Sequence, residues 1–324
     1  MLASRAAVIL CSAMLAAACG PSSSGGAKTA QNQPASDPKQ LKKVDLEFSI
    51  GGKPFPLPIV HGSVAGVATL ILVDTGANSH VIAGWLARKA QLTTLRLGEV
   101  GVDHAGRQIE TRRATHPNVK IDNWGELPDE PILVTDMPDA VAKLGIGAFL
   151  SPQQLTSEDV NVVLDFPHDE MREVRRGDSV DAPGNALALD PPHACLDDAS
   201  DVKGLLFVIA AKVEGADAML LLDTGAHHSD MFATSKPGKA ILPRSQPRGE
   251  AVYAASGKMT SRTVKNAKLQ IGALEVSRDF DLIPGQQDQF CPRDGVLAMD
   301  VLKQCVLVLE KHTVSGTCAS DVTK

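Results

Sequence analysis

Short apolar runs separated by glycine-containing turns fill two stretches of the chain, and both stretches follow the same order. Each has an apolar run, a turn with glycine, and a second apolar run that leads directly into Asp-Thr-Gly-Ala. The matching residues of the first stretch are Val64, Gly66, Leu72, Val73, Asp74, Thr75, Gly76 and Ala77. Those of the second stretch, at the same offsets, are Val213, Gly215, Leu221, Leu222, Asp223, Thr224, Gly225 and Ala226. Such runs predict β-strands, and their repetition predicts two copies of one β-rich unit.

The correspondence continues downstream of both aspartates. Polar stretches typical of hairpins follow at nearly the same distance, at His104-Ala105-Gly106 and Ala255-Ser256-Gly257. Next come two apolar segments with small residues, Gly147-Ala148-Phe149-Leu150-Ser151 and Gly295-Val296-Leu297-Ala298, and two closing strands, residues 162–165 and 307–310. We therefore predict a mostly β protein with two β-barrel lobes, and short helices at residues 83–90 and 299–303.

Composition places the boundaries of these units. Residues 44–170 form the predicted first lobe and residues 201–318 the second, and the polar, Pro-, Gly- and Arg-containing stretch 171–200 is the predicted linker. With 324 residues, of which 44% are hydrophobic and 22% charged, the chain can bury a sizeable core. A net charge of -6 without a long basic run argues against a nucleic-acid partner. We expect a monomer.

The N-terminus has the pattern of an export signal. Arg5 precedes an apolar stretch, and small residues lead up to Cys19, so residues 1–18 are the predicted signal peptide. This order resembles the bacterial lipobox, in which cleavage before the cysteine accompanies its lipidation, with Ala16 where a leucine is usual. Ordinary signal cleavage without lipid is the alternative. Residues 19–43 predict a flexible tether, so we expect a protein of the bacterial cell envelope, anchored to the membrane by lipid on the periplasmic or extracellular side.

Export implies an oxidising compartment, in which the four cysteines after Cys19 should pair. Three connectivities are open. We favour Cys291 with Cys305, which bracket the last apolar segment, and Cys195 with Cys318, which would join the two ends of the second lobe. A zinc site built from Cys305, His312 and Cys318 is the alternative, but it lacks a pair of ligands at short spacing.

Asp74 and Asp223 are the candidate catalytic residues. Asp and Gly favour turns for backbone reasons alone, which is the structural alternative. However, an apolar strand directly before each aspartate carries the carboxylate toward the interior, and such burial is unfavourable without a partner or a function. Two facing carboxylates cannot both ionise, so they share a proton and can act as base and acid in hydrolysis. Gly76 and Gly225 allow the close backbone approach that this pairing needs.

An apolar strand ending in Asp-Thr-Gly-Ala, a hairpin, and an apolar pair with a small residue before a short helix resemble the retropepsin family of aspartic peptidases. The resemblance covers both halves and implies a pepsin-like pseudo-dimer, in which each lobe supplies one aspartate. It implies that Thr75 and Thr224 brace the two loops through hydrogen bonds. It also implies flap hairpins over a polypeptide substrate in the interlobe cleft, with Gly106, Tyr253 and Gly257 as candidate residues.

The family's apolar-apolar-Gly motif is altered in this chain. It reads Val296-Leu297-Ala298 in the second half, and in the first half either Phe149-Leu150-Ser151 or a segment at Leu144-Gly145-Ile146-Gly147. Small residues at these positions still permit close packing. The predicted function is therefore an aspartic endopeptidase that uses neither cofactor nor metal. A catalytically silent peptide-binding protein of the same fold is the alternative.

A third reading builds a hydrolase triad or a metal site on Ser79, His80 and the His227-His228 pair. Neither Gly-x-Ser-x-Gly nor His-Glu-x-x-His accompanies these residues. We therefore interpret the three histidines as loop residues that face solvent.

Overall fold

The computed structural model describes residues 40–103, 107–180, 184–187, 193–197, 204–249, 252–254, 257–285 and 291–319. The predicted signal peptide, Cys19 and most of the tether lie outside these residues, as does Gly106. Within the described part of the chain, no helix is long and apolar enough to cross a membrane.

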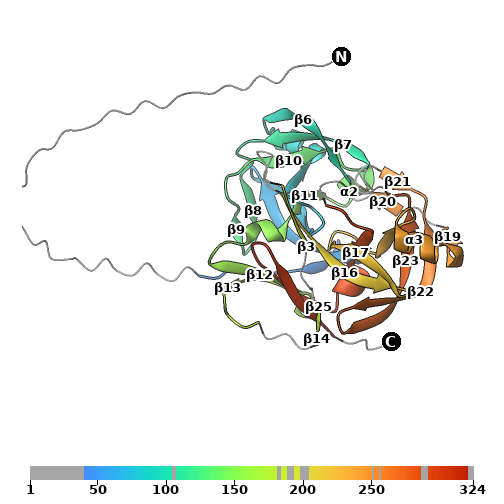
Figure 1. The fold of residues 1–324 in the computed structure, drawn as a ribbon. Coiled ribbons are helices and arrows are strands. Elements are labelled where there is room, and N and C mark those ends of the chain that lie inside the picture. The colour runs from blue at the N-terminus through green and yellow to red at the C-terminus, as the bar shows by residue number, and fades with distance from the viewer. Residues whose placement is uncertain are drawn as a thin grey trace, which may run out of the picture. The chain divides into compact units, whose positions relative to one another are not determined.

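The first lobe is built on one large sheet, in the strand order β6-β7-β10-β5-β11-β4-β3-β8-β9, with β2 paired to β3 (Figure 1). The strands are β2 (Glu47–Ile50), β3 (Lys53–Val64), β4 (Val67–Val73), β5 (Val81–Ala83), β6 (Thr94–Val102), β7 (Gln108–Ala114), β8 (Val119–Ile121), β9 (Gly125–Glu126), β10 (Ile132–Thr135) and β11 (Ile146–Leu150). Most neighbours are antiparallel, but β11 runs parallel to β4. This parallel pair carries the residues that follow β4 and β11 to the same edge of the sheet.

The second lobe repeats this central arrangement in an eight-stranded sheet, in the order β15-β16-β17-β24-β18-β23-β22-β19. Its strands are β15 (His193–Asp197), β16 (Gly204–Val213), β17 (Ala216–Leu222), β18 (Asp230–Phe232), β19 (Gln246–Pro247), β22 (Arg262–Ile271), β23 (Leu274–Ile283) and β24 (Gly295–Leu297). A separate hairpin pairs β20 (Val252–Ala254) with β21 (Gly257–Met259). Here β24 runs parallel to β17, as β11 does to β4. The predicted fold class, mostly β with two lobes, is confirmed.

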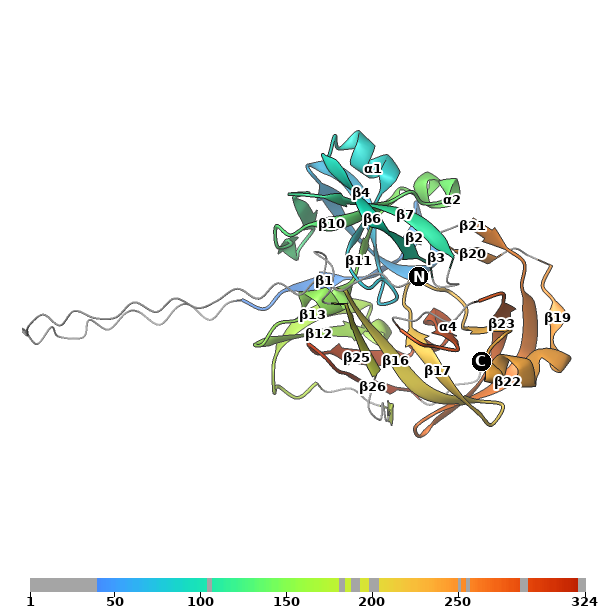
Figure 2. The ribbon, with the colours of Figure 1, turned by 45° about the horizontal axis from the view of Figure 1, so that its top comes forward.

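A third sheet contains strands from both halves, in the order β1-β13-β12-β25-β26-β14 (Figure 2). Its strands are β1 (Lys43–Asp45), β12 (Val160–Asp165), β13 (Glu170–Arg175), β14 (Asn185–Leu187), β25 (Cys305–Leu309) and β26 (Val314–Cys318). At its centre, β12 and β25 are antiparallel, with Val163 opposite Val308. The predicted linker 171–200 therefore contains most of β13, all of β14 and β15, and the segments between them.

Helices are few and short. The α-helices are α1 (Gly84–Lys89), α2 (Asp139–Lys143), α3 (Lys236–Ile241) and α4 (Met299–Leu302), and the 3-10 helices are η1 (Pro152–Leu155), η2 (Phe166–His168) and η3 (Leu242–Arg244). The two helices predicted from sequence correspond to α1 and α4, so both predictions are confirmed.

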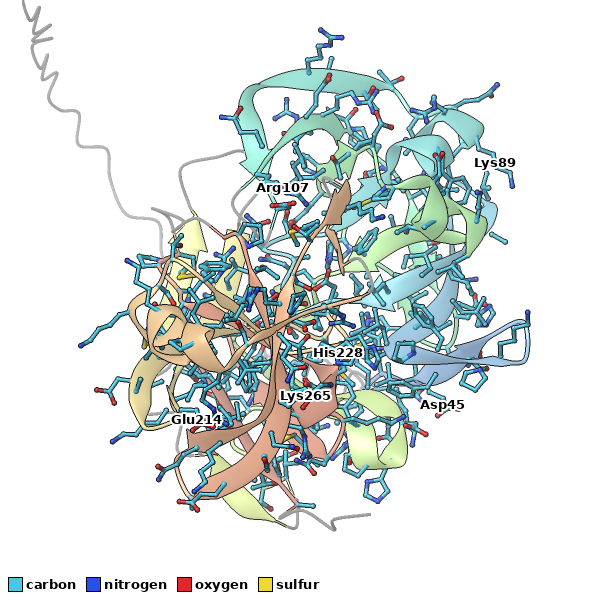
Figure 3. All side chains as sticks on the ribbon, turned by 90° about the vertical axis from the view of Figure 1, so that its right-hand side faces the viewer. Asp45, Lys89, Arg107, Glu214, His228 and Lys265 are labelled. Carbon is cyan, nitrogen blue, oxygen red and sulfur yellow. A yellow bond between two sulfur atoms is a disulfide. The ribbon has the colours of Figure 1, made fainter. Side chains whose placement is uncertain are left out.

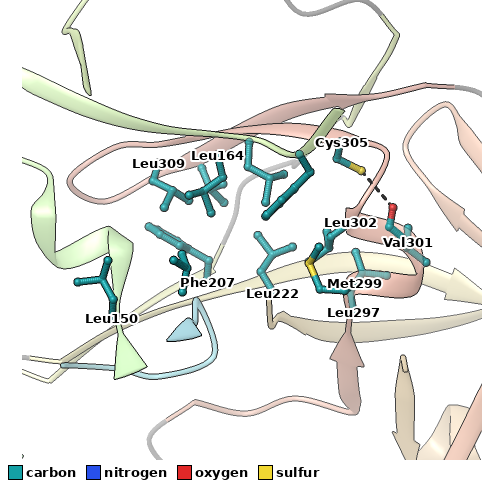
Figure 4. Packing of buried hydrophobic residues seen from close by; sticks show 14 of the residues in the cluster. Leu150, Leu164, Phe207, Leu222, Leu297, Met299, Val301, Leu302, Cys305 and Leu309 are labelled. Atoms are coloured by element: carbon teal, nitrogen blue, oxygen red, sulfur yellow. Dashed lines mark hydrogen bonds between the residues drawn. The ribbon is translucent and has the colours of Figure 1, made fainter. Parts of the chain in front are cut away.

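One apolar core runs through both lobes. Leu150 from the first half and Leu222, Leu297 and Leu309 from the second belong to the same buried cluster (Figure 4). Each of these side chains is at most 1% exposed. Because neither half buries this cluster alone, we expect the two lobes to depend on each other for stability.

The predicted disulfide pairing is wrong. Cys305 bonds to Cys318, and Cys195 bonds to Cys291. The first pair lies at directly opposed positions of the β25–β26 hairpin, with Cα atoms 4.0 Å apart. The second pair belongs to one buried cluster on the β15-β16-β17-β24 part of the second sheet. Strand register brings these cysteines together, and the sequence positions that motivated the prediction do not reveal that register.

Candidate active site

The two aspartates follow equivalent strands and occupy equivalent loops. Asp74 comes directly after β4, and its backbone N–H donates to the Leu150 carbonyl at 2.8 Å. Asp223 comes directly after β17, and its N–H donates to the Leu297 carbonyl at 3.0 Å. In the first half, Phe149-Leu150-Ser151 is therefore the counterpart of Val296-Leu297-Ala298, and the alternative segment is not.

Thr75 and Thr224 join the two loops through four reciprocal hydrogen bonds. The N–H of Thr75 donates to Thr224 Oγ1 at 3.0 Å, and the N–H of Thr224 donates to Thr75 Oγ1 at 3.1 Å. Each hydroxyl then donates to the strand that precedes the other loop, Thr75 to the Leu222 carbonyl at 2.8 Å and Thr224 to the Val73 carbonyl at 2.7 Å. Both side chains are buried, at 1% and 0% exposure. The loops are thus fixed to each other by the residues that the sequence singled out.

Each carboxyl group lies against the glycine of the opposite loop. A Cβ built on Gly76 would lie 2.6 Å from Asp223 Oδ1, and one built on Gly225 would lie 2.6 Å from Asp74 Oδ1. No side chain could occupy either place without displacing a carboxyl. Asp74 Oδ1 also accepts hydrogen bonds from its own loop, from Gly76 N–H at 2.8 Å and Ala77 N–H at 3.1 Å.

The environment favours a proton on the pair. Burial, and next the negative charge of Asp223, raise the pKa of Asp74 well above its usual 3.8, and the N–H donors of the loop only partly oppose this. A side-chain hydrogen bond with Asp223 contributes in the same direction. A further buried acid, Asp230 on β18, also has a raised pKa, because of burial and then the charge of Asp223. One carboxyl of the pair can therefore hold a proton while the other is ionised.

Gln153 in η1 is a residue of this site that sequence reasoning missed. Its side chain is 1% exposed, and its Nε2 donates to the carbonyls of Thr75 at 3.1 Å, Ala77 at 2.9 Å and Leu205 at 2.9 Å. The neighbouring Gln154 donates to the Asn78 carbonyl at 2.9 Å. An isolated glutamine has no motif around it, so only the fold reveals these contacts.

The histidines near the loops have different surroundings. His80 is not a solvent-facing loop residue as expected, because its Nδ1 accepts a hydrogen bond from Ser151 N–H at 3.1 Å and burial lowers its pKa to about 4. His227 is exposed, and its ring centroid lies 4.0 Å from that of His228. Within the described ranges, no group of three or more His, Cys, Asp or Glu side chains is arranged to hold a metal ion.

The two predicted flap hairpins approach each other. β6 and β7 form the first and β20 and β21 the second. Arg107 Nη2 donates to the Gly257 carbonyl at 3.2 Å, a contact between hairpins of different lobes (Figure 3). Gly257 has φ +112, which favours glycine. Tyr253 lies on β20, but its side chain, like Gly106, is outside the described part of the structure.

Comparison with known proteins gives two findings. A family model described as aspartyl protease matches residues 60–148, a segment that includes the Asp74 loop and the first residues of β11. Among solved structures, the crystal structure of the aspartic proteinase from Irpex lacteus aligns over 88% of this chain and 99% of that chain, with a TM-score of 0.48 and 11% sequence identity. No curated protein matches the chain.

Proposed function

We propose that this protein is an aspartic endopeptidase in which Asp74 and Asp223 form one catalytic dyad. The observation that carries the proposal is the reciprocal joining of the two loops by Thr75 and Thr224, which holds each carboxyl against the opposite glycine. A turn with a purely structural role needs no such joining of two loops. The joining also places two acids close together in a buried site, which is unfavourable without a function. The match of the aspartyl protease family model to the Asp74 half gives independent support.

In the proposed reaction, the ionised carboxylate takes a proton from a water molecule as that water attacks the carbonyl carbon of the peptide bond. The protonated carboxyl donates its proton to the carbonyl oxygen, which yields a neutral tetrahedral intermediate. The carboxyl that took a proton from water gives it to the leaving amine as the carbon–nitrogen bond breaks. The other carboxylate takes a proton from a hydroxyl of the intermediate as the new carbonyl forms, so the dyad is again singly protonated. The raised pKa of Asp74 keeps one proton on the pair for this purpose.

The altered apolar-apolar-Gly motif does not disturb the loops. Leu150 and Leu297 still accept the N–H of the two aspartates, and the small residues Ser151 and Ala298 are buried behind them. A silent peptide-binding protein therefore remains only as an outcome of the experiment below.

The decisive experiment incubates the protein with a diverse peptide mixture from acidic to neutral pH and identifies cleaved bonds by mass spectrometry. We expect cleavage with a bell-shaped pH profile on the acid side of neutrality, whose two limbs belong to the dyad. Asp74→Asn and Asp223→Asn should each lose nearly all activity, and the double variant should be hardly worse than either, because the pair acts as one unit. Asp217→Asn, an exposed aspartate on the strand that leads to Asp223, is the matched control and should remain active. Peptide binding without cleavage at any pH would support the silent alternative instead.

A further inference from the structure

The two aspartate loops are stabilised differently behind the dyad. In the second half, the first residues of α4 donate backbone hydrogen bonds to the loop. Met299 N–H donates to the Ala226 carbonyl and Asp300 N–H to the His227 carbonyl, each at 3.1 Å. The loop of Asp223 is therefore held by backbone groups, which no substitution other than proline removes.

The first half lacks the first of these donors. Since Ser151 corresponds to Ala298, the counterpart of Met299 is Pro152, the first residue of η1. Proline has no backbone N–H, so Pro152 cannot donate to the Ala77 carbonyl. Gln153 Nε2 lies 2.9 Å from that carbonyl oxygen and supplies the missing hydrogen bond.

The same amide also reaches the other side of Gly76. It donates to the Thr75 carbonyl at 3.1 Å, so it contacts the residues immediately before and after that glycine. The N–H groups of Gly76 and Ala77 are those that donate to Asp74 Oδ1. An amide has two hydrogens, which the carbonyls of Thr75, Ala77 and Leu205 share.

The third acceptor connects this loop to the second lobe. Leu205 on β16 accepts from Gln153 through its carbonyl and donates its N–H to the Asn78 carbonyl at 2.8 Å. By the offset of the repeat, the counterpart of Leu205 is Pro56, which has no N–H to donate. Among the described residues, the Asp223 loop therefore has no equivalent of the N–H that Leu205 donates to the Asp74 loop.

We infer that Gln153 is a positioning residue for Asp74, replacing a backbone donor that Pro152 removes and fixing the peptide groups that orient the carboxylate. The inference rests on the proposed function for its effect on catalysis. The Asp223 loop has its own backbone donors. Loss of the Gln153 amide should therefore affect the position of Asp74 and not that of Asp223.

The test compares Gln153→Leu with Gln304→Leu, a matched control whose side-chain Nε2 makes no hydrogen bond to the described residues. We expect Gln153→Leu to lower kcat by about 10- to 100-fold with little change in KM, because a small displacement of a catalytic group slows the chemical step. Gln304→Leu should leave both unchanged. The double variant Pro152→Ala, Gln153→Leu restores a backbone N–H at position 152 and should recover part of the lost kcat.

Three results would overturn the inference: an unchanged kcat in Gln153→Leu, an equal loss in the control, or no recovery in the double variant when Gln153→Leu is folded. Gln153→Met, which also lacks the amide, is the second variant to test if Gln153→Leu does not fold. If neither variant folds, the amide serves folding and the positioning role is rejected.

Hydrogen exchange decides the inference even if the wild type cleaves no peptide and the proposed function fails. In Gln153→Leu, the backbone amides of Gly76 and Ala77 should exchange faster than in the wild type, whereas those of Gly225 and Ala226 should not change. Equal rates at Gly76 and Ala77 in both proteins would reject the role of Gln153.

Discussion

Replacement of Thr224 by valine tests the reciprocal joining of the two loops. Valine has nearly the same shape as threonine, so the change removes the hydroxyl without leaving a cavity. Two buried groups lose their partner, the N–H of Thr75 and the carbonyl of Val73. An unsatisfied buried polar group costs about 1–3 kcal/mol, so we expect Thr224→Val to lower the free energy of unfolding by about 2–6 kcal/mol. That is a large part of the roughly 5–15 kcal/mol typical of a folded protein.

Urea unfolding followed by far-UV circular dichroism measures this loss as a shift of the midpoint. Thr313→Val is the matched control, because Thr313 is exposed and its hydroxyl donates to the partly exposed Glu310, so its effect should stay within about 0.5 kcal/mol. Thr75→Val should equal Thr224→Val, and the double variant should lose less than the sum, since either change already loosens both loops. A loss below about 1 kcal/mol for Thr224→Val, or full additivity in the double variant, would refute the reasoning.

Two further predictions concern the charge of the dyad and the cysteines. The pKa of Asp74 is raised in the folded state, so the folded protein keeps a proton that the unfolded chain releases above about pH 3.8. The free energy of unfolding therefore falls as pH rises from about 3.8 toward the raised pKa. Asp74→Asn removes this proton linkage, so its Tm should exceed that of the wild type at neutral pH, and the difference should shrink toward about pH 3; a pH-independent difference would contradict this. For the cysteines, mass spectrometry of unreduced peptides should find the pairs Cys195–Cys291 and Cys305–Cys318 and no other, and opening the second pair by substitution should cost about 2–4 kcal/mol in unfolding experiments.

Features encoded by local patterns could be predicted from the sequence. Apolar strands ending in Asp-Thr-Gly located both loops, and the threonine at the second position of each motif does join them. The short helices α1 and α4 were predicted at their observed places, one after the first aspartate loop and one after the apolar segment at residues 295–298. In these cases, the residues that determine the structure are neighbours in the chain.

Features that depend on long-range register could not be predicted. The cysteine pairs depend on which strands lie side by side. The prediction paired cysteines at the two ends of a sequence segment, and that pairing is wrong. β13 lies in a polar stretch that looks like a linker, but β12 and β1 pair with it on either side and make it a strand. Gln153 lies far along the chain from Asp74, and the reason for its contacts is the missing N–H of its neighbour Pro152.

The central pairing of β12 with β25 has a consequence for how this protein could evolve. Val163 lies opposite Val308, its counterpart in the second half, and the pairs on either side are equivalent to each other. Two identical strands would pair in the same way across the two-fold axis of a dimer. In a dimer encoded by one gene, every mutation enters both subunits at once. Here the two halves belong to one chain, so η1 can begin with a proline and a glutamine where α4 begins with a methionine and an aspartate. A single chain with two such halves can therefore change the surroundings of one loop aspartate and leave those of the other untouched, which a symmetric dimer of one gene product cannot do.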